Sequence, residues 1–73
     1  MKIHHLNALI AVVKHNFSIS SASDGLSLTQ PAISKQIQQF EAELNLSLFI
    51  RNGKRLVGLT DSGQEVYRRA LEV

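Results

Sequence analysis

The sequence predicts a mainly α-helical fold in which three helices are followed by a two-stranded β-hairpin and a further helix. Three observations lead to this fold class. Apolar residues recur at spacings of three and four over several segments, as they do on one face of a helix. Serine, threonine and asparagine bound these segments at positions suited to helix caps. A single Asn-Gly pair separates two short apolar runs, which is typical of a hairpin turn.

The composition is that of one small folded domain, because 44% of the 73 residues are hydrophobic and 19% are charged. This balance excludes a disordered tail, and the lack of cysteine excludes disulfides and thiolate zinc sites. No apolar run approaches the roughly 20 residues that a membrane helix needs. The lack of cysteine also agrees with a cytoplasmic location. A catalytic pocket is difficult to build at this size, so a binding module is the first expectation.

The first two helices are predicted over residues 3–15 and 20–26. The first is amphipathic, and Lys14 places positive charge in its last turn, where the helix dipole favours it. Asn16 follows as a candidate left-handed cap. The second helix is short, and Ser20 is placed at its start as the capping residue.

The third helix, predicted over residues 30–44, has the clearest pattern. Thr29 is its candidate N-cap, and Asn45 can close its other end in a left-handed conformation. The apolar face consists of Ile33, Ile37, Phe40 and Leu44. The opposite face is polar and carries one charge in its N-terminal half: Gln30, Pro31, Ser34, Lys35 and Gln38.

A basic hairpin follows the third helix. Its strands are predicted at about 48–51 and 56–59, on either side of Asn52-Gly53, whose residues both tolerate positive φ. Residues 51–55 carry a net charge of +3, against +2 for the whole chain, from Arg51, Lys54 and Arg55. Such a concentration of positive charge suggests a polyanionic partner, although a solvated turn has the same composition.

The last helix is predicted to begin after Thr60 and to continue to the end of the sequence at residue 73. Thr60 is its candidate N-cap, and Asp61 in the first turn favours the helix dipole. Two apolar strips run along it, one made of Val66, Ala70 and Val73 and the other of Tyr67 and Leu71. One strip can pack on the domain, and the other is then free to contact a second copy of the chain. A solvent-facing charge added at Ala70 should therefore weaken dimerisation.

The order of the elements predicts a winged helix-turn-helix. In this motif two helices are joined by a short turn, here Ser27-Leu28, and a hairpin follows as the wing. The second helix of the pair lies in the major groove of DNA and contacts bases through its N-terminal residues. A basic hairpin tip is suited to phosphates or to the minor groove.

Over its whole length the sequence resembles the N-terminal DNA-binding domain of LysR-type bacterial transcriptional regulators. The resemblance rests on Thr29-Gln30-Pro31-Ala32-Ile33-Ser34, Leu48-Phe49-Ile50-Arg51 and Thr60-Asp61-Ser62-Gly63. It divides the chain into a winged helix-turn-helix domain at 1–59 and the start of a linker and dimerisation helix at 60–73. Within the family, the wing and one extra residue before Thr29 resemble the subgroup that controls cysteine biosynthesis and sulfur assimilation.

The resemblance implies sequence-specific binding to a double-stranded DNA operator by a homodimer. The dimer would form through the last helix, at Val66, Tyr67, Ala70 and Leu71. The resemblance further implies a homotetramer in the full-length protein. It also implies a small-molecule effector, bound by a C-terminal domain that this chain lacks.

The predicted DNA contacts combine helix 30–44 in the major groove with the wing, 52–55, at the minor groove or the backbone. They are Ser20, Thr29, Gln30, Pro31, Ser34, Lys35, Gln38, Asn52, Lys54 and Arg55. Lys35 suits guanine acceptors, but it stands where the family often has arginine, whose bidentate fork lysine lacks. A purely capping role fits Ser20 equally well. Arg51 has two possible roles, a phosphate contact or an ion pair with Glu41 or Glu43.

Two alternatives use the same architecture: another winged-helix regulator, or a winged-helix protein-interaction module that makes no DNA contact. The polar, acid-free N-terminal half of the third helix favours DNA. An enzyme is the least favoured class, because no pairing of nucleophile and base is apparent. His4 and His5 are adjacent and therefore lie on different faces of a helix, so we expect no metal site and no cofactor.

Overall fold

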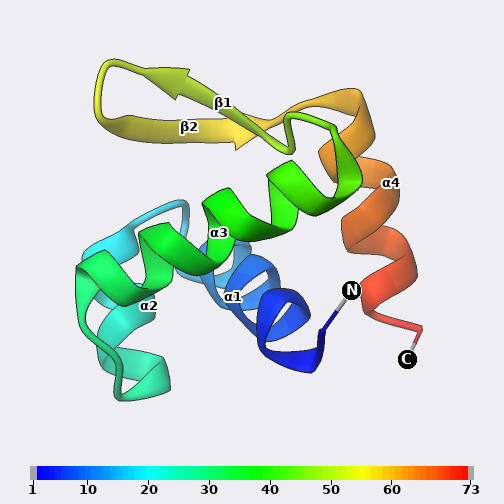
Figure 1. Ribbon diagram of the computed structural model, residues 1–73. Helices are drawn as coiled ribbons and strands as arrows, with labels where there is room; N and C mark the ends of the chain where they lie inside the picture. The colour runs from blue at the N-terminus through cyan, green and yellow to red at the C-terminus, as the bar shows by residue number, and fades with distance from the viewer. Residues whose placement is uncertain (1, 73) are drawn as a thin grey trace.

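The computed structural model describes residues 2–72 as four helices and one two-stranded antiparallel sheet (Figure 1). The elements are α1 Ile3–Lys14, α2 Ile19–Leu26, α3 Gln30–Leu44, β1 Phe49–Asn52, β2 Arg55–Leu59 and α4 Asp61–Ala70. The first three helices pack on one another, the hairpin lies along α3, and α4 packs against α1. The predicted fold class, a mainly helical winged helix-turn-helix, is confirmed.

The core lies between the three N-terminal helices. Leu9 and Val12 of α1, Ala22 of α2, and Ile33 and Phe40 of α3 are fully buried there. Burial of each large apolar side chain stabilises the fold by about 1.5–3 kcal/mol. The apolar face of α3 is therefore held inward, and its opposite face stays in solvent.

The turn between α1 and α2 confirms one predicted cap and corrects another. Asn16 has a φ of 56°, as expected for a left-handed cap. The N-cap of α2 is Ser18 rather than Ser20, because the Ser18 hydroxyl accepts a hydrogen bond of 3.1 Å from the Ser21 amide. Ser20 lies inside the first turn with an exposed side chain, and its carbonyl accepts from the Ser23 hydroxyl at 2.8 Å.

The helix-turn-helix is formed by α2 and α3, and its caps are local. Ser27 ends α2 with a left-handed φ of 56°. The Thr29 hydroxyl accepts from the Ala32 amide at 3.2 Å, which confirms Thr29 as the N-cap of α3. Asn45 closes the other end of α3 with a φ of 54°, also as predicted.

The hairpin loop lies where it was predicted but is shorter, because β1 extends to Asn52 and β2 begins at Arg55. Asn52 pairs with Arg55 in the strand register, so the two-residue loop is Gly53-Lys54. The predicted strand ends at 51 and 56 are each one residue short of the tip, because the loop has two residues rather than four. Of the two loop residues, Gly53 alone has a positive φ, 65°, as at the first loop position of a type II′ turn. Asn52 therefore needs no left-handed conformation and remains in β1.

The carboxylate of Glu41 joins the hairpin to α3. Its Oε2 accepts hydrogen bonds from the backbone amides of Leu48 at 2.7 Å and Phe49 at 3.3 Å. Its Oε1 accepts from the Arg51 guanidinium at 2.8 Å. Of the two roles considered for Arg51, the structure thus shows the ion pair with Glu41.

The junction between β2 and α4 is held by Thr60. Its hydroxyl accepts from the Gly63 amide at 2.9 Å, which confirms the predicted N-cap of α4. The same hydroxyl donates to the carbonyl of Ser47, and the Thr60 amide donates to the carbonyl of Leu48 at 3.0 Å. The first turn of α4 is therefore fixed against the segment that precedes β1.

Most of the apolar surface of α4 is turned toward the domain. Ala70 is only 5% exposed and belongs to the core, and Val66 and Tyr67 are half-buried beside it. The expectation that Ala70 could carry a solvent-facing charge is therefore wrong. Leu71 is 52% exposed. Val73, predicted in the same strip as Ala70, lies outside the described residues.

No helix in the part of the chain that the structure describes is long and apolar enough to cross a lipid bilayer.

Candidate nucleic-acid interface

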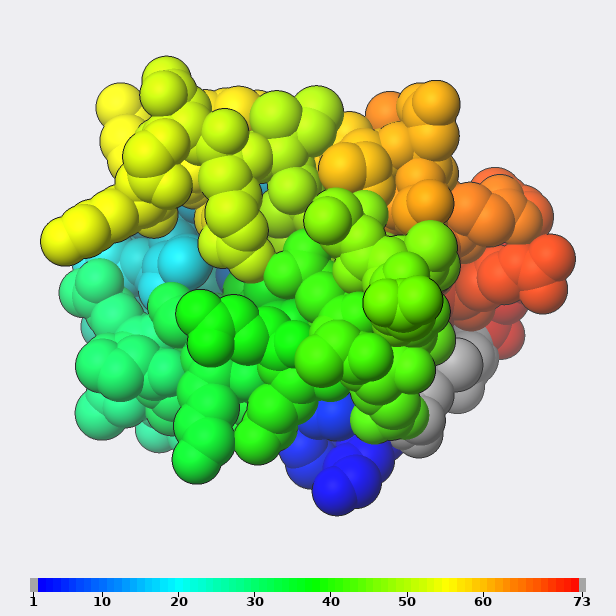
Figure 2. Space-filling view, turned by 45° about the horizontal axis from the view of Figure 1, so that its top comes forward, coloured from blue at the N-terminus to red at the C-terminus, as the bar shows by residue number. Residues whose placement is uncertain are grey.

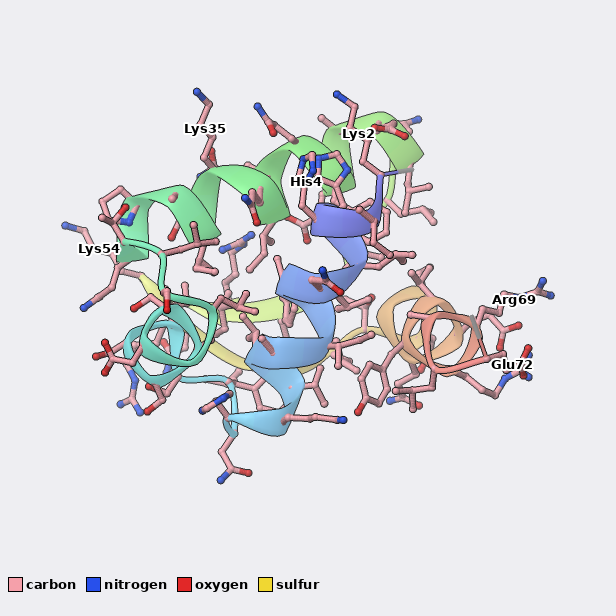
Figure 3. The ribbon with its side chains drawn as sticks, turned by 90° about the horizontal axis from the view of Figure 1, so that it is seen from below. Lys2, His4, Lys35, Lys54, Arg69 and Glu72 are labelled. Atoms are coloured by element: carbon pink, nitrogen blue, oxygen red, sulfur yellow. The ribbon has the colours of Figure 1, made fainter. Side chains whose placement is uncertain are left out.

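The polar face of α3 is exposed as predicted. Gln30, Pro31, Lys35 and Gln38 face solvent, and Ser34 is half-buried. Lys35 extends directly away from the helix (Figure 3). This orientation follows from the burial of Ile33 and Ile37 on the other side of the helix.

An open hollow of about 780 Å³ lies between the hairpin and the N-terminal half of α3. In Figure 2 the α1–α2 turn, in cyan, is visible between the yellow hairpin and the green α3. Six of the predicted DNA-binding residues line this hollow together: Ser20, Gln30, Pro31, Ser34, Lys54 and Arg55. Residues of three separate segments are thus brought to one surface.

The other predicted residues lie outside the hollow. Lys35 and Gln38 continue the exposed face of α3, and Asn52 is exposed near the hairpin tip. Thr29 is also exposed, and its hydroxyl is engaged as the α3 cap.

The contribution of the α1–α2 turn was missed by reasoning from the sequence. Asn16, Phe17 and Ser18 of this turn, and Ile19 at the start of α2, also line the hollow. Phe17 has a left-handed φ of 66° and packs edge to face against Phe49 of β1, with ring centroids 6.2 Å apart. Asn16 signalled a left-handed turn here, but no local pattern reveals that the turn would meet β1.

The charges at this surface are not neutralised within the domain. Across residues 2–72, Lys35, Lys54 and Arg55 form no ion pair, whereas Arg51, Arg68 and Arg69 each pair with a glutamate. Those glutamates lie away from the hollow. On α4, for example, hydrogen bonds from Arg68 and Arg69 hold the pKa of Glu65 below its usual value. The free cations beside the hollow are therefore available to a polyanion.

The arrangement has the chemistry of a binding surface. Lys54 and Arg55 supply positive charge, and the serines opposite supply hydroxyl groups, both of which suit phosphate oxygens. The amide, hydroxyl and ammonium groups of α3 suit the hydrogen-bonding edges of bases. No set of three metal-ligating side chains occurs within the described range, 2–72.

Comparison with known proteins identifies one family. Residues 3–64 match the model for bacterial regulatory helix-turn-helix proteins of the lysR family. The chain is 46% identical over 72 residues to the HTH-type transcriptional regulator CysB of Thiocapsa roseopersicina. It is 45% identical over 73 residues to the RuBisCO operon transcriptional regulator of Allochromatium vinosum. The alignments include 99% and 97% of this chain, but only 53% and 24% of these relatives, so the chain spans about half of one and a quarter of the other.

A solved structure supports the same assignment. The fold is similar to that of the BenM DBD in its crystal structure with benA site 1 DNA, with a TM-score of 0.89 and 35% sequence identity. The match covers 99% of this chain and 79% of that chain.

Proposed function

Because the chain belongs to the LysR family of helix-turn-helix proteins, which are DNA-binding transcription regulators and not enzymes, we propose that it binds a specific double-stranded DNA site with α3 in the major groove. One observation carries this proposal: the exposed polar face of α3 lies beside a hollow lined also by two cations, Lys54 and Arg55, that form no ion pair within residues 2–72. The BenM structure contains DNA, which supports the same use of the fold here.

The dimensions of α3 and of DNA agree with this placement. An α-helix with its side chains is about 10–12 Å across, and the major groove of B-DNA is about 12 Å wide. With α3 in the groove, Gln30, Ser34, Lys35 and Gln38 face base edges. The hollow then receives one sugar-phosphate strand, and Lys54, Arg55 and Asn52 of the wing reach the backbone or the adjacent minor groove. Ser20 and Thr29 contribute to phosphate contacts.

Replacing Lys35 with alanine tests the base-reading role. We expect affinity for a selected site to fall by roughly 10–100-fold, because one good base contact contributes about 1–3 kcal/mol of discrimination. Affinity for random-sequence DNA should fall much less. The site is first obtained by binding-site selection, and both affinities are then measured by fluorescence anisotropy.

The matched control for Lys35→Ala is Arg69→Ala. Arg69 lies on α4, and it points away from the domain at the opposite end from Lys54 (Figure 3). This control removes the same charge and should change both affinities little. Equal losses on specific and random DNA for Lys35→Ala would contradict base reading and leave only a phosphate contact.

Replacing Arg55 with alanine tests the wing. We expect the slope of log affinity against log salt concentration to become shallower by about one unit, because one fewer counterion is released. The loss of affinity should be similar for all DNA sequences. Affinity is measured in a salt series with Arg69→Ala as the control, and an unchanged slope for Arg55→Ala would show that this side chain does not reach the phosphates.

We also propose that two copies assemble through α4 and bind a two-fold-symmetric operator. Leu71, the residue that caps the C-terminal end of α4, is exposed, and Tyr67 and Val66 of α4 are partly accessible. A symmetric dimer would present two copies of α3 to two half-sites. In the full-length protein we propose a homotetramer and a small-molecule effector bound by the remaining chain.

The variant Leu71→Lys tests the α4 interface without disturbing the core, because Leu71 is exposed. We expect self-association, measured by sedimentation velocity over a concentration series, to weaken by about tenfold or more, since a charge would be desolvated. Arg69→Ala, about 200° around the helix from Leu71, is the control. Identical sedimentation of the wild type and Leu71→Lys would exclude α4 as the interface.

We propose that the protein regulates genes of cysteine and sulfur metabolism. We further propose that it acts on the chromosome in the cytoplasm. The resemblance of the wing and the 46% identity to a CysB regulator support this choice. The 45% identity to a RuBisCO operon regulator supports carbon-fixation genes as the alternative. Mapping chromosomal binding sites of the full-length protein distinguishes the two gene sets.

A further inference from the structure

We propose that Asn52 is a site of spontaneous deamidation, and that the reaction turns the wing into a form that binds DNA weakly. The covalent step rests on the hairpin alone. The effect on DNA binding rests on the proposed function.

The hairpin tip leaves the reacting groups uncovered. Asn52, Gly53 and Lys54 are all exposed. Gly53 has no side chain to shield its amide nitrogen, and a Cβ built at Gly53 would meet no atom within 4 Å. Because the loop has only two residues and lies at the tip, little of the fold must move for the Asn52 side chain to approach the Gly53 nitrogen.

The other asparagines of the chain provide an internal comparison. Asn7, Asn16 and Asn45 are followed by Ala8, Phe17 and Leu46, so each following amide is shielded by a side chain. Asn7 is also held inside α1, and Asn16 and Asn45 are held in left-handed helix-end turns. Asn52 should therefore react first.

The chemistry requires only water and a base such as hydroxide. The Gly53 backbone nitrogen loses its proton to the base and attacks Cγ of Asn52. The new N–Cγ bond closes a five-membered succinimide, the Cγ–Nδ2 bond breaks, and ammonia leaves with a proton taken from solvent. Water then opens the ring at either carbonyl and leaves aspartate or isoaspartate. No electrons are exchanged, and the nearby positive charge of Lys54 and Arg55 favours the anionic amide.

The position of Asn52 in the sheet explains why deamidation would weaken DNA binding. Asn52 lies directly opposite Arg55 in the strand register. Side chains at opposed positions have Cβ atoms about 4.5–5.5 Å apart, so a new carboxylate would pair with Arg55. The Arg55 guanidinium would then be withdrawn from phosphate. The net charge of residues 51–55 would also fall from +3, the value from Arg51, Lys54 and Arg55, to +2.

The covalent step is tested by mass spectrometry without DNA. The chain is aged at mildly alkaline pH, digested, and analysed for conversion of amide to acid, and isoaspartate is labelled with an isoaspartyl methyltransferase. We expect conversion at Asn52 well before Asn7, Asn16 or Asn45, and none at residue 52 in Asn52→Gln, whose cyclisation needs a less favourable six-membered ring. Conversion at Asn52 no faster than at the other three asparagines would overturn the proposal.

The effect on binding is tested with Asn52→Asp, a stable form of one product. We expect lower affinity and a salt slope shallower by about one unit. If the new carboxylate acts through Arg55, Asn52→Asp should cost much less affinity in an Arg55→Ala background. Wild-type affinity for Asn52→Asp and for the aged chain would overturn this second half. A fresh chain that binds no DNA would instead overturn the proposed function, while the mass-spectrometric result would still decide the covalent step.

Discussion

The variant Gly63→Ala is expected to lose most of its folding free energy. A Cβ atom at this position would overlap the carbonyl oxygen of Leu48 and lie 2.9 Å from its carbonyl carbon. Both atoms are backbone, so no side-chain rotation relieves the clash. We expect a destabilisation of about 3 kcal/mol or more, which is a large share of the stability of a domain this small.

The backbone at this contact cannot move away cheaply. The Leu48 carbonyl accepts from the Thr60 amide at 3.0 Å, and the Thr60 hydroxyl joins the Gly63 amide to the carbonyl of Ser47. Moving Gly63 away from Leu48 would therefore break the cap of α4 together with its attachment to the segment before β1. Unfolding in urea, followed by circular dichroism, measures the effect.

Gly58→Ala is the matched control for Gly63→Ala. A Cβ at Gly58 would be 3.8 Å from Cδ1 of Ile50, which is ordinary van der Waals contact. Its stability should stay within about 1 kcal/mol of the wild type, because replacing glycine in a strand also reduces the entropy of the unfolded chain. Similar losses for the two variants would show that the contact with Leu48 is not the cause.

The variant Glu41→Gln is expected to release the hairpin from α3. Both carboxylate oxygens of Glu41 accept from donors, Oε2 from two backbone amides and Oε1 from Arg51. In glutamine an NH2 group replaces one of the two oxygens. This NH2 group would then face a hydrogen-bond donor, either the backbone amides or the Arg51 guanidinium, and that donor would lose its acceptor. We expect a loss of about 1–3 kcal/mol, because Glu41 is only 16% exposed and the unsatisfied group is poorly hydrated.

Arg51→Ala separates the two functions of the Glu41 carboxylate. Arg51 is 42% exposed, so its ion pair with Glu41 should contribute only about 0–1 kcal/mol. The backbone bonds to Leu48 and Phe49 would remain. If Glu41→Gln cost no more than Arg51→Ala in urea unfolding, these backbone bonds would contribute nothing measurable.

A second measurement on Glu41→Gln connects this anchor to DNA binding. Lys54 and Arg55 line the hollow together with α3, and Glu41 holds the segment at the start of the hairpin that carries them. A loosened hairpin should therefore lower DNA affinity and the salt slope even in the folded fraction of the protein. A wild-type slope would show that the wing keeps its place without Glu41.

Much of this structure follows from interactions between residues close in sequence. The caps at Thr29 and Thr60 were predicted because a hydroxyl reaches an amide three residues ahead, whatever the rest of the fold does. Asn45 was predicted because asparagine tolerates left-handed φ. The prediction is wrong by one or two residues where several neighbouring residues suit the same role. Ser18 and Ser20 both qualify as the N-cap of α2, and Gly53 could take either position of the hairpin loop.

Periodicity, capping and charge are properties of neighbouring residues, so they predict the helices, their order, the polar face of α3 and the basic wing. Three features could be seen only in the folded chain: Glu41 holds the hairpin, Phe17 brings the α1–α2 turn to the hollow, and Ala70 is buried while Leu71 is exposed. Each of these features depends on how segments distant in sequence pack together. It therefore depends on the space that remains around the common hydrophobic core, which no single segment specifies.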